Sequence, residues 1–144
     1  MNKFLIVDDS SSARYLLKSY LGRFGECHEA EHGRDGVKMF GKALLDGVPY
    51  NLVVMDIMMP KMDGHMAVAK LRELEAKAGA PEPVKVVMLS SLDDPRNMLR
   101  AQFESGSDLY LTKPVELQTL REMLVSFGLV DEPALPVKPF GDEV

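Results

Sequence analysis

Cysteine is nearly absent from this sequence, and long apolar runs are missing altogether. The one cysteine, Cys27, can form no disulfide within the chain and cannot supply a cluster of thiolate metal ligands, which favours a reducing, cytoplasmic setting. No stretch approaches the roughly 20 apolar residues of a membrane-spanning helix. Asp8 and Asp9 interrupt the first apolar run, unlike a signal peptide. We therefore expect no insertion into a membrane.

Positive charge is also scarce, with 17 lysines and arginines against 22 aspartates and glutamates and a net charge of −5. A chain without a basic stripe cannot displace many counterions from nucleic-acid phosphates. Protein or small-molecule partners are therefore expected, and direct binding of nucleic acid is not. The 144 residues, 46% of them hydrophobic, can bury the core of one domain and are too few for two.

Five short apolar runs predict five β-strands. They are Phe4–Val7, the weaker Cys27–Ala30, Leu52–Met55, Val84–Leu89 and Leu109–Leu111. The first, third and fourth are continuously apolar rather than alternating, which is typical of parallel strands covered by helices on both faces.

Stretches with helical spacing separate these runs. The expected helices begin at Ser10–Ser12 and end at Gly22 or Gly25, run from Asp35 to about Gly47, and span Met66–Ala78, Arg96–Glu104 and Val115–Ser126. Strand and helix alternate five times with short connections. This order predicts an α/β fold, a (βα)5 doubly wound parallel sheet with right-handed crossovers.

The end of the chain differs in character from the rest. Pro133, Pro136 and Pro139 recur every third residue, the period of a polyproline II helix, and acidic residues flank them. We predict one domain over residues 1–130 and a proline-rich acidic tail, or the stub of a linker, over residues 131–144.

Polar side chains follow four of the five predicted strands. Asp8 and Asp9 follow the first, Asp56 the third, Ser90 the fourth and Lys113 the fifth. Any one of these residues alone is better explained as a solvated loop residue. Together they predict a site, because ligands bind outside the carboxyl ends of the strands in an open parallel sheet.

The predicted cluster suits Mg²⁺. Three ionised carboxylates close together repel one another, so that either their pKa values rise or a cation binds. Mg²⁺ prefers octahedral oxygen ligands and keeps some water. Asp8, Asp9 and Asp56 carry three negative charges, and Mg²⁺ with Lys113 carries three positive ones. This balance would let Asp56 approach an anionic phosphoryl donor.

Three sequence blocks resemble the signature of bacterial two-component response-regulator receiver domains. They are Leu5–Ser10, Leu52–Gly64 with its Asp-x-x-Met-Pro-x-Met-Asp-Gly pattern, and Tyr110–Pro114. The resemblance covers roughly residues 3–127 and is to the single-domain, chemotaxis-regulator type. It implies a flavodoxin-like fold with strand order 2-1-3-4-5.

The same resemblance implies the metal ligands. Asp9 and Asp56 would bind Mg²⁺ directly, Asp8 would mostly hold metal-bound water, and the backbone carbonyl of Met58 would complete the set of protein ligands. The resemblance implies no other cofactor.

It also implies the phosphoryl chemistry and the switch. Asp56 would be the nucleophile that becomes an aspartyl phosphate, and Lys113 and Ser90 would bind phosphoryl oxygens. Ser90 and Tyr110 would convert phosphorylation into a change of a protein-interaction face. The domain would be no turnover enzyme, because it would catalyse only its own phosphoryl transfer and slow autodephosphorylation.

The implied partners are a sensor histidine kinase or a histidine phosphotransfer protein in a phosphorelay, and a downstream protein target. A monomer and a phosphorylation-dependent dimer are both compatible with the sequence. Two other classes remain open: a haloacid-dehalogenase-like Mg²⁺-dependent phosphatase, and an adaptor that works without phosphorylation. The intact Asp56 and Lys113 weigh against the adaptor.

Two further sets of residues are interpreted as structural. Methionines cluster around the third predicted strand, where they are expected to fill the core; they are Met55, Met58, Met59, Met62 and Met66. The three histidines show no ligand spacing and are expected at the surface; they are His28, His32 and His65. Because Met58 and Leu92 cannot orient a water by hydrogen bonding, the phosphoryl group is expected to be long-lived.

Overall fold

The computed structural model describes residues 2–59, 61–91 and 106–131. The chain divides into two compact units, Met1–Lys113 and Pro114–Val144, and each is considered by itself. The expected helix Arg96–Glu104, the residue Leu92 and the prolines of the expected tail lie outside the described residues.

The first unit contains a sheet of five parallel strands in the order β2-β1-β3-β4-β5. The strands are β1 (Asn2–Val7), β2 (Gly25–Ala30), β3 (Leu52–Asp56), β4 (Lys85–Ser90) and β5 (Leu109–Thr112). In register, Val7 lies opposite Met55, Asp56 opposite Leu89, and Ser90 opposite Thr112. The predicted parallel sheet and its strand order are confirmed.

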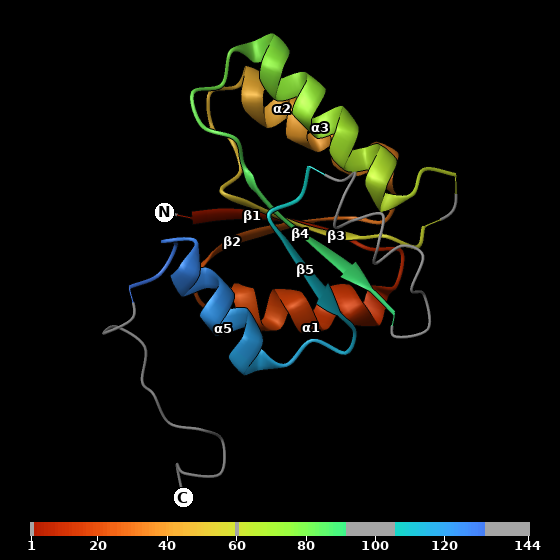
Figure 1. Cartoon of the computed structure of the whole chain (residues 1–144), viewed down its shortest axis with the longest axis vertical. Helices are drawn as coiled ribbons and strands as arrows, with labels where there is room; N and C mark the ends of the chain where they lie inside the picture. The colour runs from red at the N-terminus through yellow and green to blue at the C-terminus, as the bar shows by residue number, and fades with distance from the viewer. Residues whose placement is uncertain (1, 60, 92–105, 132–144) are drawn as a thin grey trace, which may run out of the picture. The chain divides into compact units, whose positions relative to one another are not determined.

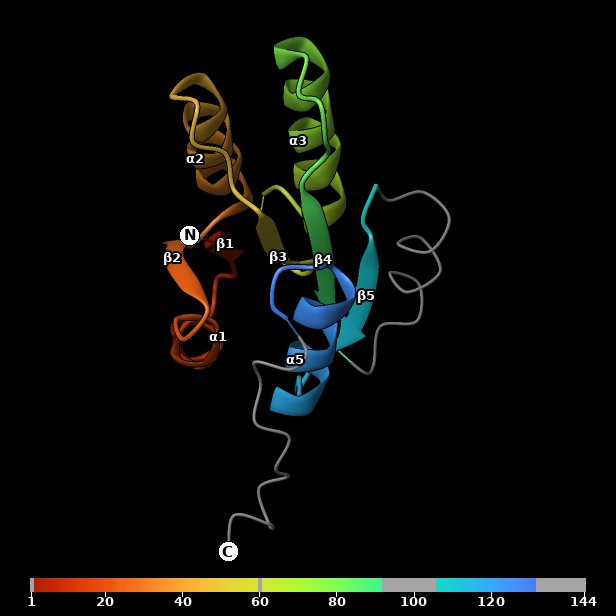
Figure 2. The ribbon, with the colours of Figure 1, turned by 90° about the vertical axis from the view of Figure 1, so that its left-hand side faces the viewer.

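Helices cover both faces of this sheet, as Figure 1 shows and Figure 2 shows from the side. The helix α1 (Ser11–Leu21) lies on one face, and α2 (Gly33–Leu45) and α3 (Gly64–Ala78) lie next to each other on the opposite face. The central strands are buried except at the first residues of β1 and β4; Leu5, Val53 and Val86 are all fully buried. The continuous apolar runs of the sequence reflect this double coverage.

Local sequence sets where these helices begin and end. The hydroxyl of Ser10 accepts a hydrogen bond from the amide of Ala13, and the carboxylate of Asp63 accepts one from the amide of Met66, so each caps the helix that follows it. The helix α3 ends at Gly79, which has the left-handed φ of 64° that favours glycine.

Most element boundaries differ from the sequence prediction by one or two residues, and those of α2 and β2 have local causes. The helix α2 begins at Gly33 rather than Asp35, because its N-cap, His32, has the extended backbone of a cap but makes no side-chain capping bond that the sequence could reveal. The strand β2 begins at Gly25 rather than Cys27, because it pairs with β1 over six residues from Asn2 onward. Backbone pairing extends this strand beyond its apolar part.

The described part of the second unit contains the helix α5 (Leu117–Ser126), which begins two residues later than expected. Its buried residues are Leu120, Met123 and Leu124, which lie on one side of the helix. Over the described ranges, no helix is long and apolar enough to cross a membrane.

Candidate phosphoacceptor and metal site

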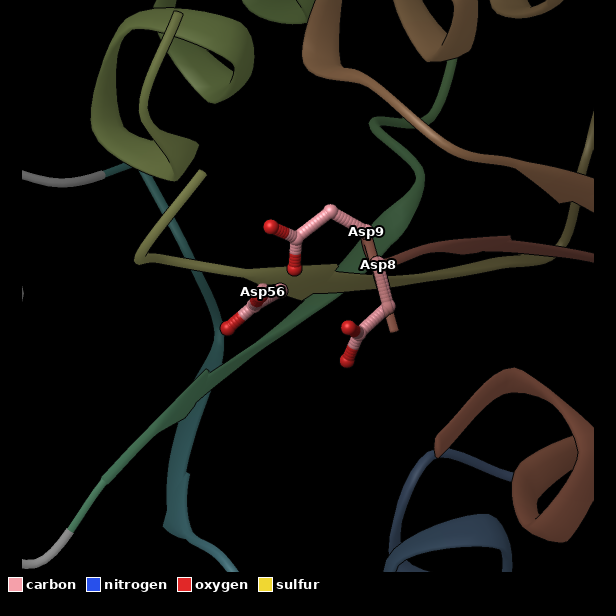
Figure 3. A group of neighbouring side chains, drawn as sticks. All are labelled: Asp8, Asp9 and Asp56. Atoms are coloured by element: carbon pink, nitrogen blue, oxygen red, sulfur yellow. The ribbon is translucent and has the colours of Figure 1, made fainter. Parts of the chain in front are cut away.

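Three carboxylates meet where β1 and β3 end, as Figure 3 shows. Asp8 and Asp9 directly follow β1, and Asp56 is the last residue of β3. Asp8 and Asp56 are buried, with 1% and 4% of their surfaces exposed, whereas Asp9 is exposed. One carboxylate oxygen from each residue lies within 4.8 Å of the others. Parallel pairing of β1 with β3 brings these residues together.

Asp8 is held by hydrogen bonds on both carboxylate oxygens. Its Oδ1 accepts the amide of Ser10 at 2.9 Å, and its Oδ2 accepts the ammonium of Lys113 at 2.9 Å. Its own amide donates to the carbonyl of Ala30 at 3.1 Å, which continues the pairing of β1 with β2. Two bonds therefore orient this carboxylate, and the third fixes the backbone that carries it.

Lys113 bridges the two buried carboxylates. Its Nζ lies 2.9 Å from Oδ2 of Asp8 and 3.3 Å from Oδ1 of Asp56. Burial alone would lower the pKa of Lys113, but the hydrogen bond to Asp8 and the charge of Asp56 outweigh it, and the pKa is raised. The amide of Lys113 donates to the carbonyl of Ser90 at 2.7 Å, which ties the lysine to the end of β4. The ammonium therefore stays charged at neutral pH.

The surroundings of Asp56 disfavour the ionised form of its carboxyl group. Burial is the largest cause and the negative charge of Asp8 the second, and against the opposing charge of Lys113 they raise the pKa of Asp56 from 3.8 to about 6. The charge of Lys113 thus offsets only part of the combined effect of burial and of the neighbouring carboxylates on this pKa. A buried carboxylate with a raised pKa in such a cluster favours the binding of a further cation.

The loop after β3 passes very close to Asp56. A Cβ on Gly64 would lie 2.5 Å from the carbonyl oxygen of Asp56, so only glycine fits there, and its amide donates to the carbonyl of Ile57 at 2.9 Å. This close contact explains the Asp-Gly pair that ends the motif. Met58 lies in the same loop, two residues after Asp56, with 54% of its surface exposed.

The two residues expected to form the switch lie on neighbouring strands. Ser90 ends β4, is fully buried, and donates its hydroxyl to the carbonyl of Ser91 at 3.0 Å. Tyr110 lies in β5 opposite Met88, is partly buried, and packs against the core. Its hydroxyl is buried and finds no hydrogen-bond partner among the described residues.

The donor set fits Mg²⁺ better than a softer metal. All the side-chain ligands that converge here are carboxylate oxygens, from Asp8, Asp9 and Asp56, and Mg²⁺ is a hard cation that takes oxygen ligands. These three carboxylates could hold the ion. The ion would neutralise charge on a transferring phosphoryl group when bound. Within this arrangement, Lys113 offers a second positive charge to the same group.

Sequence reasoning missed one residue beside this site, Arg14. It lies in the first turns of α1, has 8% of its surface exposed, and donates from Nη1 to the carbonyl oxygen of Asp8 at 2.6 Å. A signal was present, because Arg14 precedes Leu17 and Leu21 by three and seven residues, on the buried side of the helix. An arginine at an apolar-face position indicates a buried charge with partners.

The expected placement of the histidines and methionines was partly wrong. His65 has only 6% of its surface exposed, because it lies in the first turn of α3, where that helix packs on the sheet. Met55 and Met59 fill the core as expected, but Met58, in the loop after β3, and Met66, in the first turn of α3, have 54% and 46% of their surfaces exposed.

Comparison with known proteins gives one family match. The model of the response regulator receiver domain matches residues 4–125. The transcriptional regulatory protein SrrA of Staphylococcus aureus (strain NCTC 8325 / PS 47) is 36% identical over 114 residues, which are 78% of this chain and 42% of that protein. The chain spans less than half the length of this relative. The family match lends no support to the phosphatase alternative.

Solved structures agree with this match. The chemotaxis protein CheY4 of Vibrio cholerae is 26% identical, with a TM-score of 0.71, over 88% of this chain and 98% of that one. A second similar chain comes from the co-crystal structure of the Saccharomyces cerevisiae histidine phosphotransfer signaling protein Ypd1 and the receiver domain of its downstream response regulator Ssk1. It is 25% identical, with a TM-score of 0.75, over 91% of this chain and 93% of that one. These similarities confirm the expected flavodoxin-like architecture.

Proposed function

The chain belongs to the response regulator receiver domain family of two-component systems, and from this premise we propose that Asp56 is its phosphoacceptor. One observation carries the proposal: Asp56 is a buried carboxylate 3.3 Å from the ammonium of Lys113 and grouped with Asp8 and Asp9. Asp8 shares these neighbours, but both of its carboxylate oxygens already accept hydrogen bonds, from Ser10 and Lys113. A nucleophile for an anionic phosphoryl group needs positive charge beside it, and a metal ion needs the other carboxylates.

In the proposed step, a carboxylate oxygen of Asp56 attacks the phosphorus of a phosphohistidine on the donor protein. The new bond joins that oxygen to phosphorus, and the bond from phosphorus to the imidazole nitrogen breaks. The electron pair of the broken bond leaves with the imidazole, which takes up a proton. Lys113, 3.3 Å from Asp56 Oδ1, lies where its charge can bind one of the phosphoryl oxygens.

The proposed magnesium site uses Asp9 and Asp56 as direct ligands, Asp8 as the holder of metal-bound water, and the backbone carbonyl of Met58 as a third protein ligand. Asp8 suits an indirect role because Ser10 and Lys113 already engage both of its oxygens. Asp9, by contrast, is exposed and directs its carboxylate toward the cluster.

The proposed switch runs through Ser90 and Tyr110. In the described state, the hydroxyl of Ser90 donates to a neighbouring backbone carbonyl, so that it has to leave this partner to reach a phosphoryl oxygen on Asp56. The hydroxyl of Tyr110 is buried and has no hydrogen-bond partner among the described residues. Movement of this ring would therefore break no hydrogen bond to those residues. A phosphoryl group shifts the two states only through its better contacts in one of them.

The proposed partners are a sensor histidine kinase or a histidine phosphotransfer protein as donor and a downstream protein as target. A similar chain from a co-crystal structure with a histidine phosphotransfer signaling protein supports the first. The setting is proposed to be the cytoplasm, and the chain a monomer or a phosphorylation-dependent dimer. We also propose that residues 1–130 form the receiver and 131–144 a tail or linker. No turnover of external substrates is proposed, only self-phosphorylation and slow autodephosphorylation.

Labelling with acetyl phosphate tests the assignment of Asp56. With Mg²⁺, the wild type should gain one phosphoryl group by intact-protein mass, and Asp56→Asn should gain none. The matched control is Asp35→Asn, which removes an exposed carboxylate from the first turn of α2 and should be labelled like the wild type. Equal labelling of Asp56→Asn and the wild type would contradict the proposal, as would labelling that EDTA leaves unchanged.

A further inference from the structure

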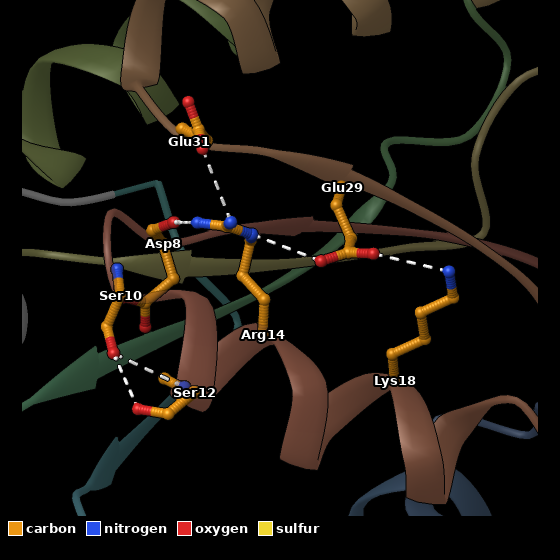
Figure 4. A network of polar contacts seen from close by, with 8 residues as sticks. Asp8, Ser10, Ser12, Arg14, Lys18, Glu29 and Glu31 are labelled. Atoms are coloured by element: carbon orange, nitrogen blue, oxygen red, sulfur yellow. Dashed lines mark hydrogen bonds and ion pairs between the residues drawn. The ribbon is translucent and has the colours of Figure 1, made fainter.

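A buried arginine, Arg14, lies beside Asp8, as Figure 4 shows. The guanidinium of Arg14 donates from Nη1 to the backbone carbonyl of Asp8 at 2.6 Å, and from Nε to Glu29 at 3.1 Å. Its Nη2 lies 3.5 Å from a carboxylate oxygen of Glu31. Burying a guanidinium is costly unless its donors are paired. Here the three partners lie in β2 or directly after β1 and β2.

The contact with the carbonyl of Asp8 reaches the metal site through the backbone. That carbonyl belongs to the peptide bond between Asp8 and Asp9, and a peptide bond is planar. Holding its oxygen therefore holds the amide nitrogen of Asp9 and restricts where the Asp9 side chain begins. Asp9 is exposed, and no hydrogen bond to its carboxylate from another described residue is seen. The backbone is then the main constraint on this carboxylate before a metal binds.

The carboxylates around Arg14 fix the guanidinium and offset its charge. Glu29 contacts Arg14 through one oxygen and Lys18 through the other, at 3.2 Å, and Glu31 adds a second negative charge. Two positive and two negative side chains make this network neutral by formal count. Arg14 can therefore lie close to the metal site without adding net positive charge that would repel a cation.

We propose that Arg14 is a positioning residue of the magnesium site: it orients the Asp8–Asp9 peptide so that the Asp9 carboxylate is preorganised to bind the ion. This inference rests on the proposed function, because it takes Asp9 as a direct ligand. Groups behind metal ligands act in this way, and their loss typically weakens metal binding by about 10- to 100-fold.

The direction in which Mg²⁺ affinity changes distinguishes a positioning role of Arg14 from an effect of its charge alone. Removing a positive side chain beside three carboxylates makes the site more negative, so Coulomb's law alone predicts tighter binding of Mg²⁺ by Arg14→Met. Positioning predicts weaker binding by the same variant. The matched control is Lys18→Met, which removes a positive charge from the same network; within the described part of the chain, Lys18 contacts Glu29 and not Asp8.

The test is the dissociation constant for Mg²⁺, measured by calorimetry on the full chain of each variant. We expect about tenfold weaker binding for Arg14→Met and unchanged or slightly tighter binding for Lys18→Met. Equal or tighter binding by Arg14→Met would overturn the inference. A merely structural role would lower the free energy of unfolding in EDTA and leave the dissociation constant of the folded protein unchanged, which would also overturn it.

A second variant covers the case in which Arg14→Met does not fold. Arg14→Lys keeps the charge, but one ammonium cannot reproduce the planar fork that joins the carbonyl of Asp8 to Glu29. We expect its binding of Mg²⁺ to be weaker than that of the wild type, and unchanged affinity would overturn the inference. If the wild type and Asp9→Asn bind Mg²⁺ equally, the proposed metal site fails together with this inference. If only Arg14→Met matches the wild type, the inference fails alone.

Discussion

Replacing the Asp56 carboxylate with the neutral amide of asparagine should make the magnesium-free protein more stable at neutral pH. Burial and the charge of Asp8 raise the pKa of Asp56 from 3.8 to about 6 in the folded protein. Between these values the folded chain binds a proton that the unfolded chain has released, so the free energy of unfolding falls as the pH rises through this window. Above about pH 6 the free energy of unfolding is lower by the full amount, about 3 kcal/mol. Asp56→Asn removes the group that causes it.

The assay is urea denaturation in EDTA at about pH 4 and pH 7, for the wild type, Asp56→Asn and the exposed-site control Asp35→Asn. Asp56→Asn should exceed the wild type by up to about 3 kcal/mol at pH 7, and the difference should nearly close at pH 4. Added Mg²⁺ should stabilise the wild type and leave Asp56→Asn much less affected. If Asp56→Asn is no more stable than the wild type at pH 7, or if the difference is the same at both pH values, the electrostatic reasoning is refuted.

Three further changes have clear expected outcomes. Gly64→Ala should lower the free energy of unfolding by about 1–3 kcal/mol and slow labelling of Asp56 by acetyl phosphate, because the new Cβ would lie 2.5 Å from the carbonyl of Asp56. Arg72→Met should lower it by about 3–5 kcal/mol in urea titrations, because the buried Glu75 would lose its ion-pair partner and keep only its hydrogen bond from the amide of Val84. The same change should leave Mg²⁺ affinity unchanged, because the contacts of Arg72 with described residues do not include the carboxylate cluster. Met58→Asn should speed the decay of the phosphorylated protein, followed by mass spectrometry, because an amide can orient an attacking water.

The sequence predicted which residues meet at the site, because the carboxyl ends of parallel strands lie at one edge of the sheet. The continuous apolar runs predicted the strands, and the polar residues directly after them then had to converge, as Asp8, Asp9, Asp56 and Lys113 do. Boundaries were harder. The edge strand β2 carries exposed Glu26 and Glu29, so its length follows from pairing with β1 rather than from its own apolar residues.

The role of Arg14 could not be predicted, since it depends on partners that the fold brings together. Its carboxylate partners, Glu29 and Glu31, lie 15 and 17 residues further along the chain, on and just after β2. In a sequence, a buried charged residue is recognisable only as a charged residue at an apolar position of a helix or strand. The pattern does not show which residues will pair with it. His65 was misplaced for the same reason, because its burial comes from packing rather than from its neighbours in the sequence.

Two tyrosine hydroxyls give a last test, because the structure predicts opposite effects for the same change. The hydroxyl of Tyr110 is buried without a hydrogen-bond partner among the described residues, whereas that of Tyr50 is bonded to Nδ1 of His28 at 2.7 Å. A buried unpaired polar atom costs stability, and a paired one contributes about 1 kcal/mol. Tyr110→Phe should therefore raise the free energy of unfolding of the unphosphorylated protein by about 1 kcal/mol, and Tyr50→Phe should lower it by a similar amount. Urea denaturation measures both, and a loss of stability in Tyr110→Phe as large as that in Tyr50→Phe would contradict this reasoning.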